Sequence, residues 1–248
     1  LIGRSLKGLD DAISVSIVEP ALTREGWRFG SYPGATTDAV NDAPFLWQIY
    51  TKADQRYTGR ATVPVLWDRQ KNTIVNNESA DILRMLNTGF GPLAKNDIDL
   101  YPAEHRTAID AFSDKIYPAL NNGVYRAGFA TTQVAYEEAF NDVFRCLDEV
   151  DAALDGKRFL FADHPTESDI RLFVTLVRFD VAYHGLFKCN LRRVADYRNL
   201  RPFVRAMLDW PGIRETVDID HIKQGYYSIA SLNPNGIVPL GPDLSEVL

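Results

Sequence analysis

Cysteine is scarce in this sequence, which has only Cys146 and Cys189 among its 248 residues. Two cysteines do not make a disulfide framework, so we expect a protein of the reducing cytoplasm. Cys146 lies near the apolar face of a predicted helix, where we expect an inert, buried thiol. Cys189 follows Lys188, and we expect it to be more exposed. The four histidines show no metal-ligand spacing with the cysteines or with one another, so no metal site is predicted.

Basic residues are too few for a protein whose main partner is nucleic acid. The formal net charge is -6 and the pI is about 5.3, whereas binding to a phosphate backbone requires a basic face. No apolar run approaches the roughly 20 residues of a membrane helix, and no secretory signal opens the chain. We therefore expect neither nucleic acid nor a membrane as partner. Hydrophobic residues make up 46% of the chain, enough for one large domain or two ordinary ones.

Residues 62–82 predict a strand, a tight turn, a second strand and the start of a helix. Pro64 gives no N–H group to a sheet, so it belongs at the first residue of a strand or at an edge. The backbone of Val63 would then be free to pair with an extended ligand. The second strand runs into a helix that begins with Glu78 and Ser79, and the N–H groups at such a helix start bind anions.

The segments before this stretch predict half of a βαβ unit. Residues 1–9 have helical spacing without a capping residue ahead, and residues 12–18 alternate apolar with small polar residues, as in a strand. A right-handed crossover needs a parallel strand before the helix, so we expect an opening strand and turn to precede Leu1. Residues 25–40 have the aromatic, loop-like composition of a segment that covers a ligand, and residues 45–50 predict a short helix.

The second half of the sequence predicts helices, because its apolar residues repeat with a period of 3.6 from Glu104 onward. The expected helices are 104–123, 131–154, 168–183, 199–209 and 212–225. Thr166 to Asp169 have the form of a capping box ahead of the third of these helices. Residues 231–242 contain too many proline and glycine residues for regular structure.

The predicted fold class is therefore α/β followed by all-α. We expect an N-terminal domain over residues 1–88, a linker over 89–103, a helical domain over 104–225 and an irregular tail over 226–248. The boundary is set at the composition break Gly89-Phe90-Gly91-Pro92.

This order of elements resembles the glutathione transferase fold, in which a thioredoxin-like domain, here without its first strand, precedes a helical bundle. Particular motifs narrow the resemblance to the xi class, the glutathionyl-hydroquinone reductases, over nearly the whole chain. The motifs are Gly26-Trp27-Arg28-Phe29, Ile74-Val75-Asn76-Asn77-Glu78-Ser79, Asn121-Asn122-Gly123-Val124-Tyr125, Tyr226-Tyr227, and Asn233-Pro234 followed by Ile237-Val238-Pro239. The sequence departs from the family at Gln224-Gly225, before the paired tyrosines, where the family commonly has histidine.

The resemblance implies a two-step thiol exchange with glutathione as cosubstrate. The nucleophile would be the cysteine of a Cys-Pro-Trp-Ala motif upstream of Leu1, so no catalytic residue is expected within the sequence itself. Its thiolate would attack the sulfur of a glutathionyl-hydroquinone, the hydroquinone would leave, and a second glutathione would release oxidised glutathione from the mixed disulfide. A homodimer is also implied.

Five residues would bind glutathione by this resemblance. The backbone of Val63 would pair with the cysteinyl part of the tripeptide. Glu78 would take the ammonium group of the γ-glutamyl residue and Ser79 its carboxylate, while Trp27 and Arg60 would flank the ligand.

Three tyrosines, Tyr125, Tyr183 and Tyr226, match those that line the hydroquinone site and donate hydrogen bonds to its oxygens. Two alternative functions stay open at this stage. One is a binding protein that has the fold but no catalysis, and the other is a transferase that conjugates glutathione through an activated serine or tyrosine.

Overall fold

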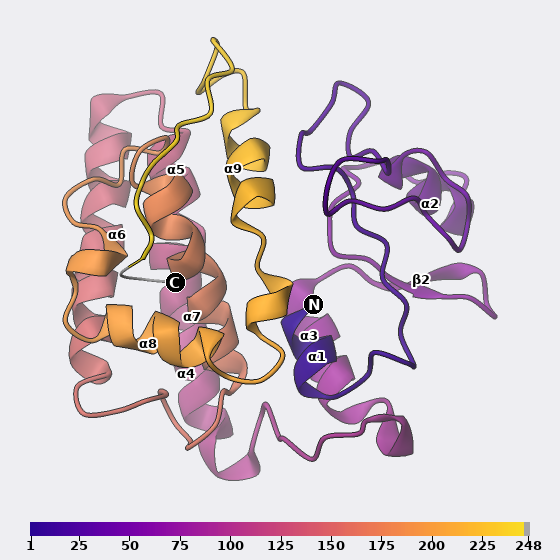
Figure 1. Cartoon of the computed structure of the whole chain (residues 1–248), viewed down its shortest axis with the longest axis horizontal. Coiled ribbons are helices and arrows are strands. Elements are labelled where there is room, and N and C mark those ends of the chain that lie inside the picture. Colours follow the sequence, from indigo (N-terminus) through magenta and orange to yellow (C-terminus); the bar gives the residue numbers. More distant parts are fainter. Residues whose placement is uncertain (246–248) are drawn as a thin grey trace.

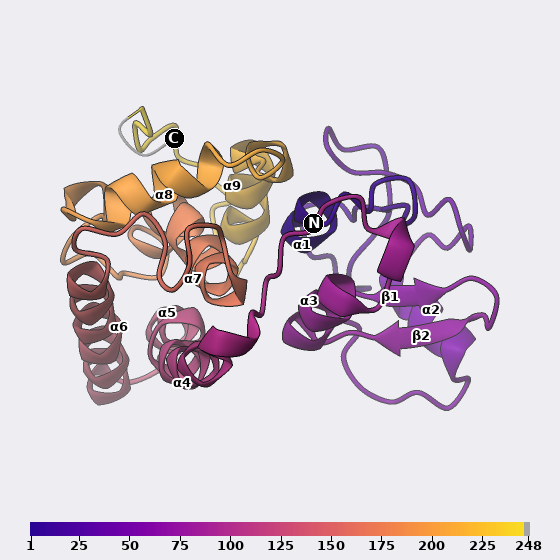
Figure 2. The same cartoon turned by 90° about the horizontal axis from the view of Figure 1, so that it is seen from below.

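The N-terminal domain combines a small hairpin with three helices in the computed structural model, which describes residues 1–245. Its elements are α1 (Ile2–Leu6), α2 (Leu46–Ala53), β1 (Leu66–Asp68), β2 (Thr73–Asn76) and α3 (Ser79–Thr88). Figure 2 shows α1 and α3 on the side of this domain that faces the helical domain, with the hairpin farther away. The predicted helices at 45–50 and after Glu78 are confirmed.

The predicted hairpin is confirmed, but its first strand begins later than expected. β1 and β2 are antiparallel, with Trp67 opposite Ile74, and residues 62–65 are irregular, with a cis peptide bond between Val63 and Pro64. The carboxylate of Asp68 accepts the N–H groups of Gln70 and Lys71 at 2.9 Å and so stabilises the turn.

The prediction of a strand at residues 12–18 is wrong. The segment makes single contacts with neighbouring loops: Val18 forms an isolated bridge with Phe29, and the carbonyl of Ile17 accepts the N–H of Thr36. Alternating apolar residues form a strand only beside a partner strand, and none lies next to this segment among the described residues. The loop predicted at 25–40 is confirmed.

The helical domain is built from six α-helices among the described residues, joined by short 3₁₀ and π-helical turns. The helices are α4 (Arg106–Ile116), α5 (Gly123–Gly128), α6 (Gln133–Ala153), α7 (Glu167–Arg178), α8 (Leu200–Leu208) and α9 (Ile219–Tyr227). The 3₁₀ turns are Gly91–Leu93, Ala103–His105, Val194–Asp196 and Arg214–Thr216, and the π-helical turns are Tyr117–Asn121 and Phe179–Tyr183.

Three of the five predicted helices differ from the structure in their continuity or extent. The helix expected at 104–123 changes to a π-helical turn after Ile116, where Pro118 has no N–H group to donate. The helix expected at 168–183 likewise ends in a π-helical turn. The helix expected at 212–225 is wrong as a single element, because Asp218 starts a new helix by accepting the N–H of His221 at 2.9 Å.

The capping box predicted ahead of α7 is confirmed. The N–H and the hydroxyl of Thr166 donate to the carboxylate of Asp169 at 2.8 and 2.6 Å. The other oxygen of Asp169 accepts the N–H of Leu160 at 2.8 Å. Burial raises the pKa of the Asp169 carboxyl, whereas these hydrogen bonds favour its charged form.

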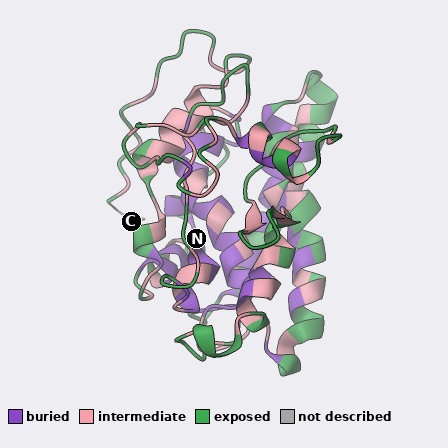
Figure 3. Ribbon diagram, turned by 90° about the vertical axis from the view of Figure 1, so that its right-hand side faces the viewer, coloured by how far each residue is buried: buried purple, intermediate pink, exposed green. Residues whose placement is uncertain are grey.

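One hydrophobic core extends across both domains. Most of its buried residues, purple in Figure 3, lie in the helical domain, but Ile2 and Leu6 of α1 and Leu83 of α3 belong to the same cluster. A smaller core holds Leu46, Ile49 and Tyr50 of α2 against the hairpin. The apolar contact between the domains fixes α3 against the helical domain.

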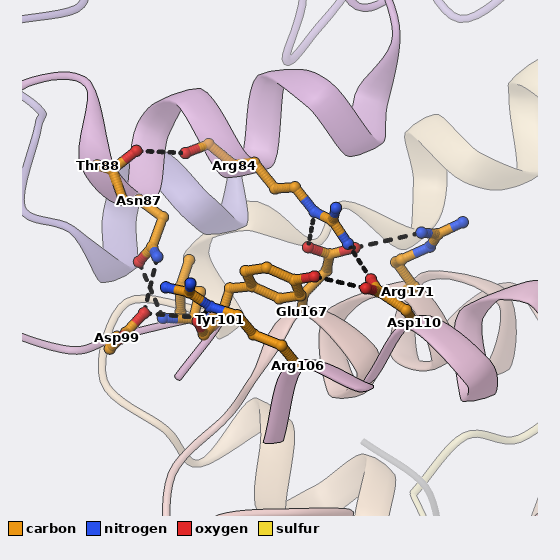
Figure 4. Close-up of polar contacts among 10 residues, drawn as sticks. Arg84, Asn87, Thr88, Asp99, Tyr101, Arg106, Asp110, Glu167 and Arg171 are labelled. Atoms are coloured by element: carbon orange, nitrogen blue, oxygen red, sulfur yellow. Dashed lines mark hydrogen bonds and ion pairs between the residues drawn. The ribbon is translucent and has the colours of Figure 1, made fainter. Parts of the chain in front are cut away.

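A polar network joins α3 to α4 and α7 (Figure 4). Arg84 donates to both oxygens of Glu167, at 2.8 and 3.2 Å, and to Asp110 at 2.6 Å. The side chain of Glu167 is only 1% exposed, so its charge depends on this arginine and on Arg171 at 3.3 Å. The hydroxyl of Tyr101 donates to Asp110 at 2.6 Å, and this bond and Arg84 lower the pKa of the Asp110 carboxyl.

Residues 228–245 are irregular, as predicted, whereas Tyr226 and Tyr227, placed at the start of the predicted tail, are the last two residues of α9. The side chain of Asn233 donates to the carbonyls of Tyr227 and Ile237 and so secures the start of the tail. The last three residues of the predicted tail, 246–248, lie outside the described residues. The four domain limits given above stay predictions. No helix in the described part of the chain is long and apolar enough to cross a membrane.

We expect Arg84→Met to lower the free energy of unfolding by about 3 kcal/mol, because it leaves the buried Glu167 carboxylate poorly compensated. Urea unfolding monitored by circular dichroism measures this loss. Arg145→Met is the matched control, because Arg145 pairs with Asp142 on the surface of α6 and its loss should cost about 0.5 kcal/mol or less. Equal losses in the two variants would show that Glu167 does not depend on Arg84.

Candidate glutathione and tyrosine sites

The start of α3 places Glu78 and Ser79 at the surface. Glu78 is the N-cap residue in extended conformation, Ser79 is the first helical residue, and both side chains are exposed. No side chain of the described residues caps this helix. The first N–H groups of α3 are therefore open to an anionic group of a ligand.

Val63 lies beside this helix start. The carbonyl of the preceding Thr62 accepts the hydroxyl of Tyr50 at 2.8 Å, and the Thr62 hydroxyl accepts the side-chain amide of Asn77 at 3.4 Å. Val63 itself is 46% exposed, and its own N–H and carbonyl make no hydrogen bond with the described residues. The residue before Val63 is thus hydrogen-bonded to the residue before Glu78, and the Val63 backbone is unpaired among the described residues.

Trp27 and Arg60 make no hydrogen bond or ion pair with Val63, Glu78 or Ser79 among the described residues. The ring of Trp27 packs against the core formed by α2, and its carbonyl accepts the N–H of Leu46 at 2.8 Å. The side chain of Arg60 is exposed and forms no ion pair with the described residues, while its carbonyl accepts the hydroxyl of Tyr57. Their contacts with glutathione stay predictions.

The three predicted tyrosines meet in one cluster, although they are far apart in the sequence. The hydroxyl of Tyr226 lies 2.6 Å from that of Tyr125 and 2.7 Å from that of Tyr183. Tyr125 comes from α5, Tyr183 from the turn after α7 and Tyr226 from α9. Tyr226 thus connects three elements of the helical domain through one hydroxyl.

Phe187, which was not predicted as a site residue, packs against all three rings of this cluster. Its ring centroid lies 5.3, 5.2 and 5.7 Å from those of Tyr125, Tyr183 and Tyr226. A Cβ atom at Gly128 of α5 would lie 2.4 Å from the Phe187 ring, so glycine is needed for this approach. Phe187 follows Tyr183 by four residues, a spacing that brings side chains together on a helix, and this spacing could have indicated the contact between the two rings.

The cluster favours the protonated form of two of its phenols, Tyr183 and Tyr226. Burial raises the pKa of Tyr183, which is 3% exposed, and the neighbouring tyrosines raise it further. Burial also raises the pKa of Tyr226, and the charge of Arg178 opposes this shift only in part. Protonated hydroxyls can donate hydrogen bonds to oxygens of an aromatic ligand, and Tyr125, 38% exposed, is open to one.

Both cysteines are enclosed. Cys146 is 2% exposed and burial raises its pKa to about 11, as expected for an inert thiol. The expectation that Cys189 is more exposed is wrong, since it is fully buried and its pKa is raised to about 12. Its N–H donates to the carbonyl of Tyr183, which turns it inward while Lys188 adopts a positive φ of 61°. Neither thiol can supply a thiolate at neutral pH.

A polar cavity of about 370 Å³ lies between α3, α4 and α7 and contains none of the eight predicted residues. Its lining consists of Ala80, Asp81, Arg84, Asp110, Ser113, Asp114 and Arg171. Within the described residues, no group of three or more histidine, cysteine, aspartate or glutamate side chains could hold a metal ion.

The chain is similar to known proteins over nearly its whole length. Two family models match the chain, the N-terminal domain of glutathione S-transferases over residues 1–88 and the C-terminal domain over residues 133–206. The glutathionyl-hydroquinone reductase PcpF of Sphingobium chlorophenolicum is 50% identical over 243 residues, which cover 98% of this chain and 78% of that protein.

A second relative has been solved with glutathione bound. The glutathionyl-hydroquinone reductase YqjG of Escherichia coli is 50% identical over 250 residues, 99% of this chain and 76% of that protein. Its glutathione-bound structure matches 98% of this chain and 79% of its own with a TM-score of 0.95. The xi-class enzyme from Natrialba magadii matches the whole chain and 76% of its own at 46% identity, with a TM-score of 0.97. The fold is thus a thioredoxin-like domain followed by a helical domain.

We expect both cysteines to be unreactive in the folded chain. Ellman's reagent added to a protein consisting of residues 1–248 should label neither thiol before unfolding and both after unfolding in guanidinium chloride. Cys189→Ser should remove one of the two thiols counted after unfolding and none before. Rapid labelling of the folded protein would contradict the burial of these residues.

The tyrosine cluster predicts a loss of stability at alkaline pH. The folded state raises the pKa values of Tyr183 and Tyr226. Their contribution to the free energy of unfolding is therefore complete below the unfolded pKa of about 10 and is lost as the pH rises above that value toward the folded pKa. Urea unfolding between about pH 9 and about pH 11 should show that the free energy of unfolding falls more steeply with pH in the native protein than in Tyr183→Phe. Equal slopes would contradict the predicted shift.

Proposed function

The chain belongs to the glutathione transferase family, within its xi class, and from this premise we propose that the protein reduces glutathionyl-hydroquinones to hydroquinones. Glutathione would be the cosubstrate and oxidised glutathione the second product. The observation that carries the proposal is the cluster in which the Tyr226 hydroxyl joins those of Tyr125 and Tyr183. Protonated phenols so placed suit a substrate that presents two ring oxygens.

The proposed reaction divides into two exchanges at sulfur. The nucleophile would be a cysteine upstream of Leu1 in the full-length protein, and the burial of Cys146 and Cys189 supports this assignment by removing both from consideration. The thiolate forms a bond to the glutathione sulfur while the sulfur–carbon bond breaks and the ring carbon takes up a proton. A second glutathione thiolate then breaks the mixed disulfide and leaves as oxidised glutathione.

The residues of the chain would hold the two parts of the substrate. The unpaired backbone of Val63 would pair with the cysteinyl unit of glutathione, while Glu78, Ser79 and the N–H groups of α3 would take the γ-glutamyl end. Trp27 and Arg60 would complete that site. Tyr125, Tyr183 and Tyr226 would donate to the hydroquinone oxygens and favour the departure of the ring.

A transferase that uses an activated tyrosine is less compatible with the site. Such an enzyme needs a phenol whose pKa is lowered, whereas burial raises the pKa values of Tyr183 and Tyr226. The homodimer and the cytoplasmic location stay predictions.

The test uses the full-length protein with a synthetic glutathionyl-hydroquinone and glutathione, and chromatography follows the released hydroquinone. We expect turnover by the native protein. Tyr226→Phe should lower kcat/KM about tenfold through the loss of its hydroxyl, and Glu78→Gln should raise the KM for glutathione about tenfold or more.

Tyr117→Phe is the matched control, because Tyr117 is 57% exposed and lies outside the proposed sites. It should keep native kinetics. Glutathione conjugation to an electrophile without release of hydroquinone would favour the transferase alternative. Glutathione binding without either reaction would favour a binding protein.

A further inference from the structure

Helix α9 lies between the other helices of the helical domain and the loops of the N-terminal domain (Figure 1). The hydroxyl of Tyr32, in the loop of residues 25–40, donates to the carboxylate of Asp220 in the first turn of α9 at 2.6 Å. The Tyr32 ring also meets the ring of His221 edge-on, with centroids 6.0 Å apart. A hydrogen bond and a ring contact therefore join this loop to one side of α9.

Two glycines let the N-terminal domain approach α9 closely. Gly34 has a φ of +85°, and a Cβ atom there would lie 2.9 Å from the carboxylate of Asp218, the N-cap residue of α9. A Cβ atom at Gly225, within α9, would lie 3.1 Å from the carbonyl oxygen of Pro20. The N-terminal domain thus contacts α9 at its first turn and again near Tyr226.

The same helix carries Tyr226, the residue that joins the tyrosine cluster. Asp220 and Tyr226 are six residues apart, about 600° of rotation along an α-helix, so their side chains leave the helix on different sides. One side of α9 meets Tyr32, and the other meets Tyr125 and Tyr183. Lys223 secures the helix from a third direction, because its ammonium group donates to the carbonyl of Leu240 in the tail at 2.8 Å.

The residues proposed to bind the two parts of the substrate lie in different domains. Val63, Glu78 and Ser79 belong to the N-terminal domain, and the tyrosines belong to the helical domain. Arg84 and Glu167 tie the domains together at α3 and α7, whereas Tyr32 and Asp220 tie them at α9. The second tie acts directly on the helix that bears Tyr226.

We propose that Tyr32 and Asp220 are positioning residues that set the place of the Tyr226 hydroxyl relative to the glutathione site. The inference rests on the proposed function and assigns it two residues outside the predicted site. Neither residue belongs to the tyrosine cluster, so both act through α9. Losing their bond leaves the glutathione residues intact and displaces the phenol that receives the hydroquinone ring.

The experiment separates the two exchanges of the full-length protein. In Tyr32→Phe and Asp220→Ala, formation of the mixed disulfide from a glutathionyl-hydroquinone should slow about threefold to tenfold, the effect of losing one hydrogen bond. Release of the mixed disulfide by glutathione should keep its native rate, because that step does not use the tyrosines. The double variant should be no slower than either single variant.

Two variants control for the chemistry of the change. Asp220→Asn keeps an oxygen that can accept the Tyr32 hydroxyl and should recover most of the lost rate. Asp148→Ala removes an exposed carboxylate that pairs with Arg192 and should leave both exchanges unchanged. Slowing of both exchanges in Tyr32→Phe, or of neither, would overturn the inference.

Amide hydrogen exchange tests, without any activity measurement, whether the Tyr32–Asp220 hydrogen bond stabilises α9. Peptides from residues 219–227 should exchange faster in Tyr32→Phe than in the native protein and should be unchanged in Asp148→Ala. Unchanged exchange in Tyr32→Phe would overturn the inference even if the native protein did not release hydroquinone. Faster exchange together with an inactive native protein would reject the proposed function and retain the restraint on α9.

Discussion

The buried carboxylate of Glu167 is the constraint on which the relation of the two domains depends. A charge that is 1% exposed requires compensation, and its main partner, Arg84, comes from α3 of the other domain. The helix that presents Glu78 and Ser79 is therefore tied to the helix that begins at Glu167. Residues of α1 and α3 also bury apolar surface in the shared core, which stabilises the contact between the domains without fixing its geometry. The Arg84–Glu167 ion pair fixes the orientation of α3 relative to α7.

The tyrosine cluster follows a different physical principle. The hydroxyl of Tyr226 lies within hydrogen-bond distance of those of Tyr125 and Tyr183, and the ring of Phe187 packs against all three rings. The buried hydroxyls of Tyr183 and Tyr226 therefore have hydrogen-bond partners, which lowers the cost of burying them. Glutathione, in the proposed function, is bound by charged groups and backbone donors at the surface. The proposed enzyme thus divides its work between an exposed ionic site and an enclosed neutral site, one in each domain.

Local patterns could be predicted from the sequence, and contacts between distant segments could not. The capping box from Thr166 to Asp169 is local and is confirmed, whereas the strand at residues 12–18 failed because it depends on a partner strand. The exposure of Cys189 was wrong because its hydrogen bond to Tyr183 is not visible in neighbouring residues. Resemblance, not spacing, grouped the tyrosines. Neither the spacing of residues nor the resemblance indicated the hydrogen bond between Tyr32 and Asp220.

The burial of Cys146 and Cys189 has a consequence for how the proposed mixed disulfide is resolved. Many thiol exchange enzymes use a second, resolving cysteine that attacks the first within the same protein. Both cysteines of this sequence are enclosed, with pKa values raised to about 11 and about 12, so neither can take that part. In the proposed cycle a second glutathione takes that part, so the rate at which the mixed disulfide is resolved would follow the concentration of free glutathione.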